Sequence, residues 1–251
     1  LVEFQSYYFN GICSNGQDQC QEKLKILNNS LKKYITFDKP YRSQTVSSIL
    51  KIPKSLDDCI YKMRKIHKGN AVREVIKAEK KGYMFDFFNI KNHTVDLVEI
   101  NYSMRYRQGR KMSTAYHKSV EEYGGIPNKL FDIQEPICDL HYNKWIGVFL
   151  PDPNHMQGDI NVKRRLVGYV NLTRFGSIVI YGSILGHGEY LKDGIMYFLN
   201  QKIIDFLINH NKKNDINIEY ILYAGWDDGG VGLQRWKKRN LFKPFYLKQL
   251  N

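Results

Sequence analysis

The chain has 251 residues, enough for one large domain or two small ones. Lysine and arginine number 38 against 25 aspartates and glutamates, and the resulting net charge of +13 favours an anionic partner such as nucleic acid or a phosphorylated cofactor. A general bias towards lysine and asparagine would give the same charge. The longest apolar runs have the length of strands and residues 1–12 lack the pattern of a signal peptide, so we expect no membrane span and a cytoplasmic protein.

The four cysteines show no C-x-x-C spacing and are expected to be reduced thiols: Cys13, Cys20, Cys59 and Cys138. Cys138, His141 and His155 could in principle meet at a metal ion. Their spacing fits no standard zinc pattern and a fourth ligand is missing, so we expect no metal site.

The first part of the chain carries no catalytic motif. A helical pattern covers residues 20–34, and a strand-like run covers residues 41–50. A second helical stretch is predicted over residues 56–81, followed by a strand at 84–88. We expect residues 1–70 to form an N-terminal α/β portion.

A short helical turn at residues 96–103 leads into a block rich in arginine, at residues 105–116. Guanidinium groups match phosphates and carboxylates with two parallel hydrogen bonds, and Gly109 would let a ligand approach the backbone closely. The alternative is a structural loop in which the arginines bind local carbonyl groups. We single out Arg107, Arg110 and Tyr116 as candidates for substrate binding.

The middle of the chain predicts strands. An aromatic strand at residues 145–150 precedes a turn-rich insertion, in which His155 is expected to be exposed. Two apolar runs, at 166–172 and 177–181, are separated by a short turn with Gly176, which predicts a β-hairpin.

The last third has the order strand, glycine turn, helix, strand, basic helix, strand. The strand ends at Gly186-His187-Gly188, and Asp193-Gly194-Ile195-Met196 opens a long amphipathic helix. A second strand at 220–226 and a glycine-rich break precede the basic run at 232–244.

This order resembles the cofactor-binding half of the Gcn5-related N-acetyltransferase (GNAT) superfamily. The resemblance implies a mixed α/β fold for residues 71–251, with a central, mostly antiparallel sheet flanked by helices. It also implies transfer of an acyl group from acetyl-CoA or another acyl-CoA to an amine or hydroxyl acceptor, which the arginine block suggests is anionic. Residues 1–70 would then be part of a partial, second GNAT-like half.

A second resemblance concerns the donor. The block Lys77-Ala78-Glu79-Lys80-Lys81-Gly82-Tyr83 is similar to a short basic block of the FemABX-type aminoacyl transferases, which are built from GNAT-like domains. That family, like the leucyl/phenylalanyl transferases, takes aminoacyl-tRNA as its donor, and the positive charge fits this alternative. A third alternative, favoured by the charge and the 18 tyrosines, is a non-catalytic protein that binds nucleic acid or assists its modification.

The GNAT resemblance assigns the donor site to the end of the strand at Gly186 and to the helix that follows it. The best register of the pyrophosphate motif sets Gly194 on its first glycine, but Leu191 replaces its Gln or Arg and Met196 its last small residue. These departures keep aminoacyl-tRNA open as the donor. The residues expected to bind the donor are Leu185, Gly186, Gly188, Lys192, Asp193, Gly194, Ile195, Trp236 and Lys237.

Proton transfer is expected at the same place. A histidine between two glycines at a strand end suits a general base, because its ordinary pKa is near 6.5. The resemblance implies a tyrosine as proton donor to the leaving group. The candidates for catalysis are His187, Glu189 and Tyr223, and Trp226 and Asp227 are expected in the acceptor pocket. Asp193 could instead be no more than the N-cap of its helix.

Overall fold

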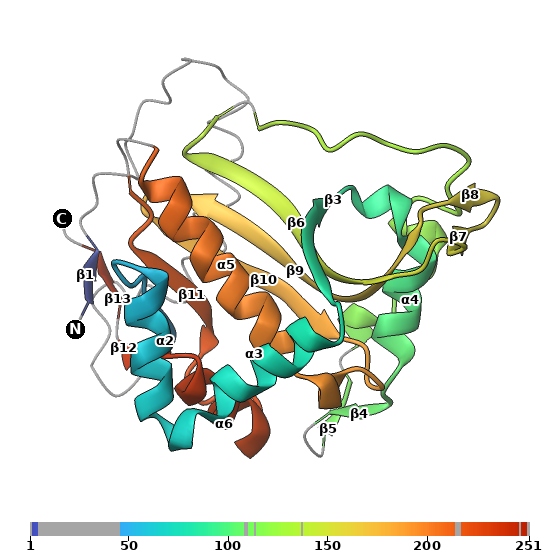
Figure 1. Ribbon diagram of the computed structural model, residues 1–251. Helices are drawn as coiled ribbons and strands as arrows, with labels where there is room; N and C mark the ends of the chain where they lie inside the picture. The colour runs from blue at the N-terminus through green and yellow to red at the C-terminus, as the bar shows by residue number, and fades with distance from the viewer. Residues whose placement is uncertain are drawn as a thin grey trace.

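The computed structural model describes residues 2–4, 46–107, 110–112, 114–136, 138–213, 217–245 and 247–249 (Figure 1). The helix predicted at 20–34 and the first half of the strand predicted at 41–50 lie outside the described residues. The second half of that strand is present as β2.

A seven-stranded sheet forms the centre of the fold, in the order β12-β2-β11-β10-β9-β6-β3. Within the described residues β10 and β11 are its one parallel pair, so the expected mixed, mostly antiparallel sheet is confirmed. The strands are β2 (Ser47–Lys51), β3 (Met84–Phe88), β6 (His141–Pro151), β9 (Arg164–Phe175), β10 (Ile178–Gly186), β11 (Tyr220–Gly225) and β12 (Lys243–Phe245).

Three short two-stranded ribbons accompany the central sheet. Their strands are β1 (Val2–Phe4) with β13 (Leu247–Gln249), β4 (Tyr106–Arg107) with β5 (Arg110–Lys111), and β7 (Met156–Gln157) with β8 (Ile160–Asn161).

Alternation of apolar side chains builds a core on each face of the sheet. Val170 and Ile184 belong to the larger core, while their neighbours Tyr169 and Leu185 belong to the smaller one. The hairpin predicted from residues 166–181 is confirmed as β9 and β10, which pair from Phe175 opposite Ile178 to Gly168 opposite Gly186.

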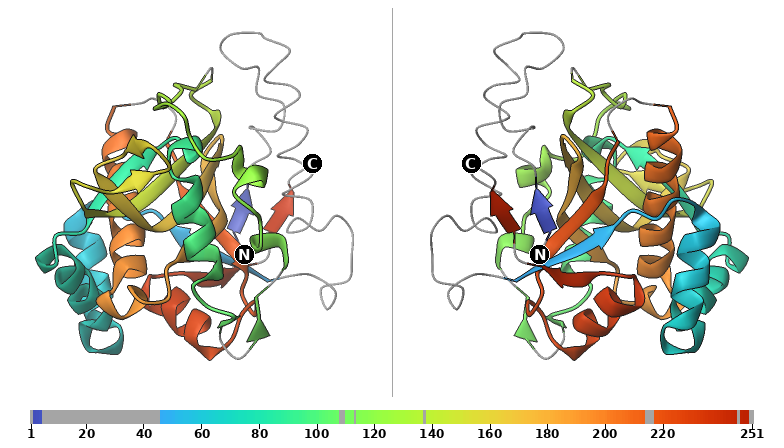
Figure 2. Two further views of the ribbon diagram at one scale, coloured as in Figure 1. Left: turned by 90° about the vertical axis from the view of Figure 1, so that its right-hand side faces the viewer. Right: turned by 90° about the vertical axis from the view of Figure 1, so that its left-hand side faces the viewer.

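Helices cover both faces. Figures 1 and 2 show α2, α3 and α5 together on one face, where they enclose the larger core, and α4 packs against β9 and β10 in the smaller one. The helices are α2 (Leu56–Lys65), α3 (Asn70–Lys80), α4 (Thr94–Tyr102), α5 (Ile195–Asn211) and α6 (Val231–Arg239). Short 3-10 turns are η3 (His67–Gly69), η4 (Ile90–Asn92), η5 (Thr114–Tyr116), η6 (Glu121–Tyr123) and η7 (Leu191–Asp193).

The single helical stretch predicted over residues 56–81 is wrong in one respect. Three successive residues, His67, Lys68 and Gly69, have positive φ angles of 48°, 57° and 70°, which end α2 and let the chain restart as α3. The expected division between residues 70 and 71 falls in the first turn of α3. Side chains from both sides of it, such as Met63 and Val75, lie in the same core.

Candidate functional site

The two parallel strands of the sheet separate. They pair only where Ile178–Ile180 faces Tyr220–Leu222. Beyond this point β10 follows β9 to Gly186, and β11 follows β2 to Gly225, each past an irregularity in its register. Such bulges bend strands and increase their twist, so the ends of β10 and β11 diverge and leave room between them.

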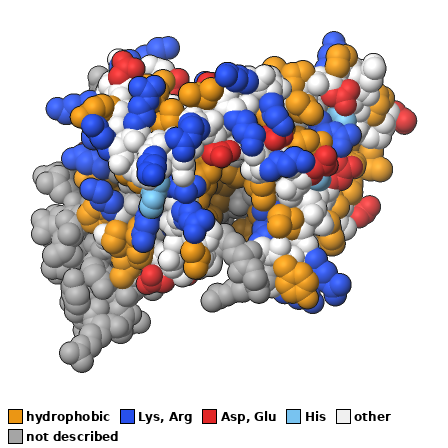
Figure 3. Space-filling view, turned by 60° about the horizontal axis from the view of Figure 1, so that its bottom comes forward, with side chains coloured by type: hydrophobic (Ala, Val, Ile, Leu, Met, Phe, Trp, Pro, Cys, Tyr) orange, Lys and Arg blue, Asp and Glu red, His pale blue; other side chains and the backbone are white. Residues whose placement is uncertain are grey.

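A cavity of about 320 Å³ occupies this split. Figure 3 brings the bottom of Figure 1 towards the viewer. It shows a hollow that has hydrophobic side chains in its walls and lysines and arginines around it. The cavity is lined by Arg107, Met112, Tyr116, Ile184, Leu185, Gly186, Leu191, Met196, Tyr197, Tyr223, Gly232, Leu233 and Trp236.

Arg107 supplies the charge of the cavity. Its Nη2 donates a hydrogen bond of 2.7 Å to the carbonyl oxygen of Gly186, at the end of β10. Its Nε is buried without a partner among the described residues. Burial lowers the pKa of Arg107, and the neighbouring Tyr169, Tyr116 and Tyr223 act against this shift. The buried Nε–H therefore still requires an acceptor, for which an oxygen atom is the usual partner.

Helix α6 provides the opposite wall. The ring of Trp236 stacks on Phe242 at 5.8 Å and meets Tyr223 edge-on at 5.7 Å, which fixes its position. Trp236 is 9% exposed, and among the described residues its indole N–H has no acceptor. Arg107 and Trp236, which both line the cavity, therefore each carry a buried N–H without an acceptor among the described residues.

The turn before α5, where a pyrophosphate was expected, is packed with protein. A Cβ added to Gly186 would lie 2.6 Å from Sδ of Met196 and 2.9 Å from Cδ2 of Leu191. Gly194 has φ of 81° and faces the backbone of Glu74 in α3, so an added Cβ would collide there. The bulky residues that depart from the pyrophosphate motif thus fill the space next to Gly186.

The backbone donors of this turn are engaged as well. The N–H groups of Leu191, Asp193 and Gly194 bond to the carbonyl groups of His187, Tyr190 and Leu191 respectively. Three N–H groups in the turn that leads into α5 are therefore already used and are not offered to a phosphate there.

Asp193 ties the turn to α3 and β3. Its carboxylate accepts hydrogen bonds from Lys81 Nζ at 2.6 Å and Tyr83 Oη at 2.8 Å. Burial raises the pKa of Asp193, but these two bonds outweigh burial and hold it below its usual range. The N-cap of α5 is Gly194, so the alternative of Asp193 as the cap is wrong.

Several other expected donor residues lie elsewhere. Lys237 is fully buried, and its Nζ donates to the carbonyl groups of Gly225, Trp226 and Asp228. Ile195 belongs to the larger core, and Lys192 is exposed. Burial lowers the pKa of Lys237 against the opposing effect of Asp228 and Asp227. The contacts of Lys237 are those of a residue that holds the turn after β11.

Two expected acceptor residues, Trp226 and Asp227, lie in that turn and do not line the cavity. The N–H of Trp226 bonds to the carbonyl of Val46, and Nζ of Lys238 lies 5.9 Å from the ring centre of Trp226. Asp227 is exposed. Arg110 pairs with Arg107 in the β4–β5 ribbon, and its side chain lies outside the described part.

The structure places the three candidates for proton transfer in two different locations. Tyr223 lines the cavity, whereas His187 and Glu189 follow the end of β10 without lining it. The ring of His187 is half-buried, and its Nδ1 accepts the N–H of Glu189 at 3.3 Å. Burial lowers the pKa of His187, against the opposing effect of Glu189 and Glu99.

Gly188 lies beside the chain that enters β4. Its N–H donates to Ser103 Oγ at 2.9 Å, and an added Cβ would lie 2.5 Å from Cγ of Met104. This close approach explains a glycine here without a ligand.

Sequence reasoning missed seven residues of the cavity wall. Leu191 and Met196 were noticed only as departures from a motif, and the others carry no chemical signal. They are Met112, Ile184, Leu191, Met196, Tyr197, Gly232 and Leu233. The aromatic and aliphatic residues among them look like ordinary core positions in the sequence.

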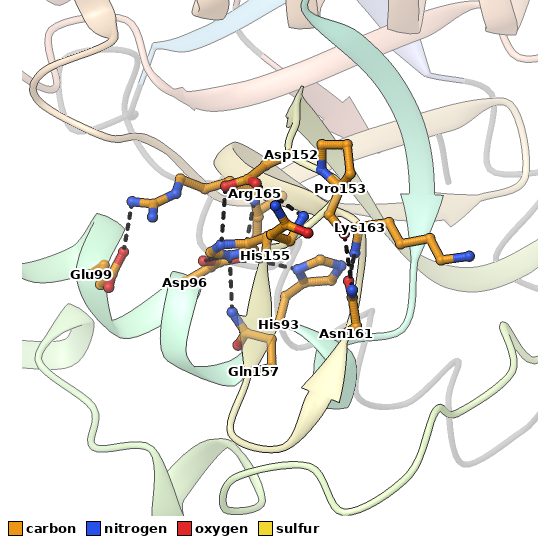
Figure 4. Close-up of polar contacts among 12 residues, drawn as sticks. His93, Asp96, Glu99, Asp152, Pro153, His155, Gln157, Asn161, Lys163 and Arg165 are labelled. Atoms are coloured by element: carbon orange, nitrogen blue, oxygen red, sulfur yellow. Dashed lines mark hydrogen bonds and ion pairs between the residues drawn. The ribbon is translucent and has the colours of Figure 1, made fainter.

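A second polar cluster lies between α4 and the β7–β8 ribbon (Figure 4). Asp96 is buried and accepts bonds from His93 Nδ1 at 2.9 Å, His155 Nε2 at 2.8 Å and the N–H of Leu166 at 3.0 Å. His155 is 8% exposed, so the expectation of an exposed residue is wrong. Its partner Asp96 is distant in the sequence, which no local pattern reveals.

Acid should weaken the fold through its buried and half-buried histidines. Burial lowers the pKa of His93 although Asp96 opposes it, and burial also lowers the pKa of His141, His187 and His210. Below pH of about 6.5 the unfolded chain then binds more protons than the folded one, so stability is complete above this pH and is lost below it. Thermal unfolding between pH 7.5 and 5 should show a falling midpoint.

The variant His93→Gln should flatten this pH dependence, while His67→Gln, at an exposed residue of η3, should leave it unchanged. An equal pH dependence in His93→Gln and the unaltered protein would contradict the role of His93.

The residues considered for a metal do not come together. Cys138 Sγ lies 3.4 Å from His141 Nδ1 at the start of β6, and His155 follows the far end of that strand. In the described part of the chain, no three His, Cys, Asp or Glu side chains are grouped to hold a metal ion.

Positive charge gathers on the helix pair α2–α3, next to η7. Exposed cations there are Lys62, Arg64, Lys65, Lys68, Arg73, Lys77, Lys80 and Lys81. Arg235 and Lys238 of α6 add two more beside the cavity wall. None of the helices seen in the described ranges has the length and apolar character that crossing a membrane requires.

The solved structure of FemX shares this fold. FemX matches with a TM-score of 0.54 and 12% identity, over 93% of this chain and 68% of FemX. Two further matches are the C-terminal domain of a putative lysylphosphatidylglycerol synthetase from Agrobacterium fabrum (TM-score 0.43, 8% identity) and L-PGS from Bacillus licheniformis (TM-score 0.41, 8% identity). Each of these covers 80% of this chain and 58% of its own. No known protein family and no curated protein sequence matches the chain.

Proposed function

We propose that this protein is an aminoacyltransferase that takes its aminoacyl group from aminoacyl-tRNA and passes it to an amine or hydroxyl acceptor. The observation that carries the proposal is the open cavity between β10 and β11 beside a filled turn before α5. The cavity offers room for a reacting acyl group, whereas Met196, Leu191 and α3 occupy the space where a CoA pyrophosphate would approach. The FemX fold and the basic block at residues 77–83 support the same donor.

The reaction needs few protein groups. The acceptor nitrogen or oxygen attacks the ester carbonyl carbon, the bond from that carbon to the ribose oxygen breaks, and the ribose hydroxyl leaves. Arg107 and the indole N–H of Trp236 would stabilise negative charge on the carbonyl oxygen, because both residues line the cavity and each carries a buried donor without a partner among the described residues. Tyr223 would protonate the leaving oxygen. His187 lies just past the end of β10 and outside the cavity wall, so it would accept the proton of an acceptor that approaches from that side.

The cationic surface of α2 and α3 would bind the tRNA. Its lysines and arginines attract phosphates without regard to sequence, and such binding weakens as salt is raised. This surface joins the cavity at η7, where Lys77 Nζ donates to the carbonyl of Lys192. One end of a nucleic acid that lies on α3 would therefore reach the opening of the cavity.

Binding of aminoacyl-tRNA, deacylated tRNA and acetyl-CoA by the intact protein tests this proposal. We expect aminoacyl-tRNA to bind about 10-fold or more tightly than deacylated tRNA, and acetyl-CoA not to bind. Arg107→Gln should abolish the preference, since a charge-assisted hydrogen bond contributes about 1.5–3 kcal/mol. Equal affinity for the two tRNAs would indicate a general nucleic-acid binder, and saturable acetyl-CoA binding would restore acyl-CoA as the donor.

Arg105→Gln provides the matched control. Arg105 is exposed in the same segment, and its loss removes the same charge. This variant should lower the affinity for both tRNAs by the same factor and keep the preference for the aminoacylated form. A loss of preference in Arg105→Gln would show that Arg107 acts only through net charge.

A further inference from the structure

We infer that the cavity selects aminoacyl groups with a large, uncharged, apolar side chain. The inference rests on the proposed function, because it names the substrate class of the same cavity. It follows from what the walls contain and from which buried groups lack a partner.

The walls are aromatic and aliphatic almost throughout. Tyr116, Tyr223 and Trp236 contribute rings, and Leu185 and Leu233 contribute aliphatic surface. Arg107 is the one charged side chain among the described lining residues. An apolar ligand side chain gains free energy when it leaves water for such walls, and a charged one loses hydration without compensation.

A cationic side chain is disfavoured most. A lysyl or arginyl group would enter a cavity that already holds the guanidinium of Arg107, and no carboxylate of the described lining could neutralise it. A glycyl group would leave most of the 320 Å³ unfilled. Leucyl and phenylalanyl groups are large enough to contact the walls and carry no charge.

The polar end of the ligand also has a place. Arg107 and Trp236 line the cavity, and each has one buried donor, Nε and Nε1 respectively, without a partner among the described residues. The carbonyl oxygen of the aminoacyl group is common to all amino acids and would accept these bonds. Arg107 and Trp236 would therefore set affinity for every donor, and the apolar walls would set the choice among them.

Stable 3′-aminoacylamino-3′-deoxyadenosines, in which an amide replaces the ester, test the inference by calorimetry with the intact protein. The phenylalanyl and leucyl compounds should bind about 10- to 100-fold more tightly than the glycyl compound, the range expected for burial of one such side chain. The lysyl compound should bind no better than the glycyl one. Tightest binding of the glutamyl compound would overturn the inference, because Arg107 would then read a side-chain carboxylate.

Two variants locate the contact. Leu233→Ala should weaken the phenylalanyl compound about 5-fold or more and leave the glycyl compound unchanged, whereas Val231→Ala, at a residue of the same helix that is 72% exposed, should change neither. Trp236→Phe should lower the affinity for all the compounds by the same factor. An equal loss of both compounds in Leu233→Ala would overturn the inference.

The two proposals fail in different ways. If aminoacyl-tRNA is preferred over deacylated tRNA but the analogues bind with equal affinity, the selectivity is wrong and the proposed function stands. If aminoacyl-tRNA shows no preference and no analogue binds, both are wrong.

Discussion

Replacing Lys237 by methionine is expected to lower the free energy of unfolding by about 3 kcal/mol. Methionine has a similar length, but it leaves three carbonyl groups, those of Gly225, Trp226 and Asp228, without their buried donor. Chemical denaturation measures the loss. The neighbouring variant Lys238→Met removes an exposed lysine and should change stability by less than about 0.5 kcal/mol.

The same pair of variants separates structure from donor binding. If Lys237→Met keeps full stability but loses affinity for the donor, the expected role of Lys237 in holding donor phosphates would be restored. We expect the reverse, because the described contacts of its side chain are with the end of β11, the turn that follows, and one neighbouring ring, that of Tyr223.

The second large effect is expected for Gly194→Ala, which should lower the free energy of unfolding by about 3 kcal/mol or more. A non-glycine residue with φ near 81° costs about 1–2 kcal/mol, and the added Cβ would also collide with the carbonyl oxygen of Glu74. Gly82→Ala is the matched control, since Gly82 has φ of 77° and nothing within 4 Å of an added Cβ. It should cost only about 1 kcal/mol.

The difference between the two losses, measured in urea, reports the contact between the turn before α5 and α3. Equal losses would show that α3 yields easily at this point. A stable Gly194→Ala protein with weakened donor binding would favour the glycine as part of a donor site.

Local patterns predicted the elements around the cavity well. The hairpin β9–β10, the helix after Gly194 and the strand from Tyr220 all follow from apolar periodicity and glycine positions. Arg107 and Tyr116 were expected near a ligand because of their unusual grouping, and they line the same cavity as Tyr223 and Trp236. The sequence did not predict that a residue expected to bind the acyl donor, Trp236, and one expected to bind the acceptor substrate, Arg107, line the same cavity. Their proximity depends on how β4 folds back onto β10.

The failures concern contacts between distant residues. His155 looked like part of an exposed turn, but it is buried and hydrogen-bonds to Asp96. Asp193 could have been the cap of its helix, but Gly194 is the cap and the side chains of Lys81 and Tyr83 bind Asp193. In each case a buried polar group finds its partner in an element far away along the chain. A sequence shows which groups need partners and not which partners they find.

The position of β2 has a consequence for how the chain acquires its structure. Ile49 lies opposite Leu222 on one side and Lys243 on the other, so a strand synthesised early pairs only with strands synthesised much later. Pairing across such long loops slows folding, because the entropy of loop closure is lost before the strand contacts form. During synthesis the apolar residues of β2 would stay without neighbours, and an unpaired strand of this kind favours aggregation. The rate at which the protein matures should therefore depend on the arrival of β11 and β12 more than on the stability of any helix.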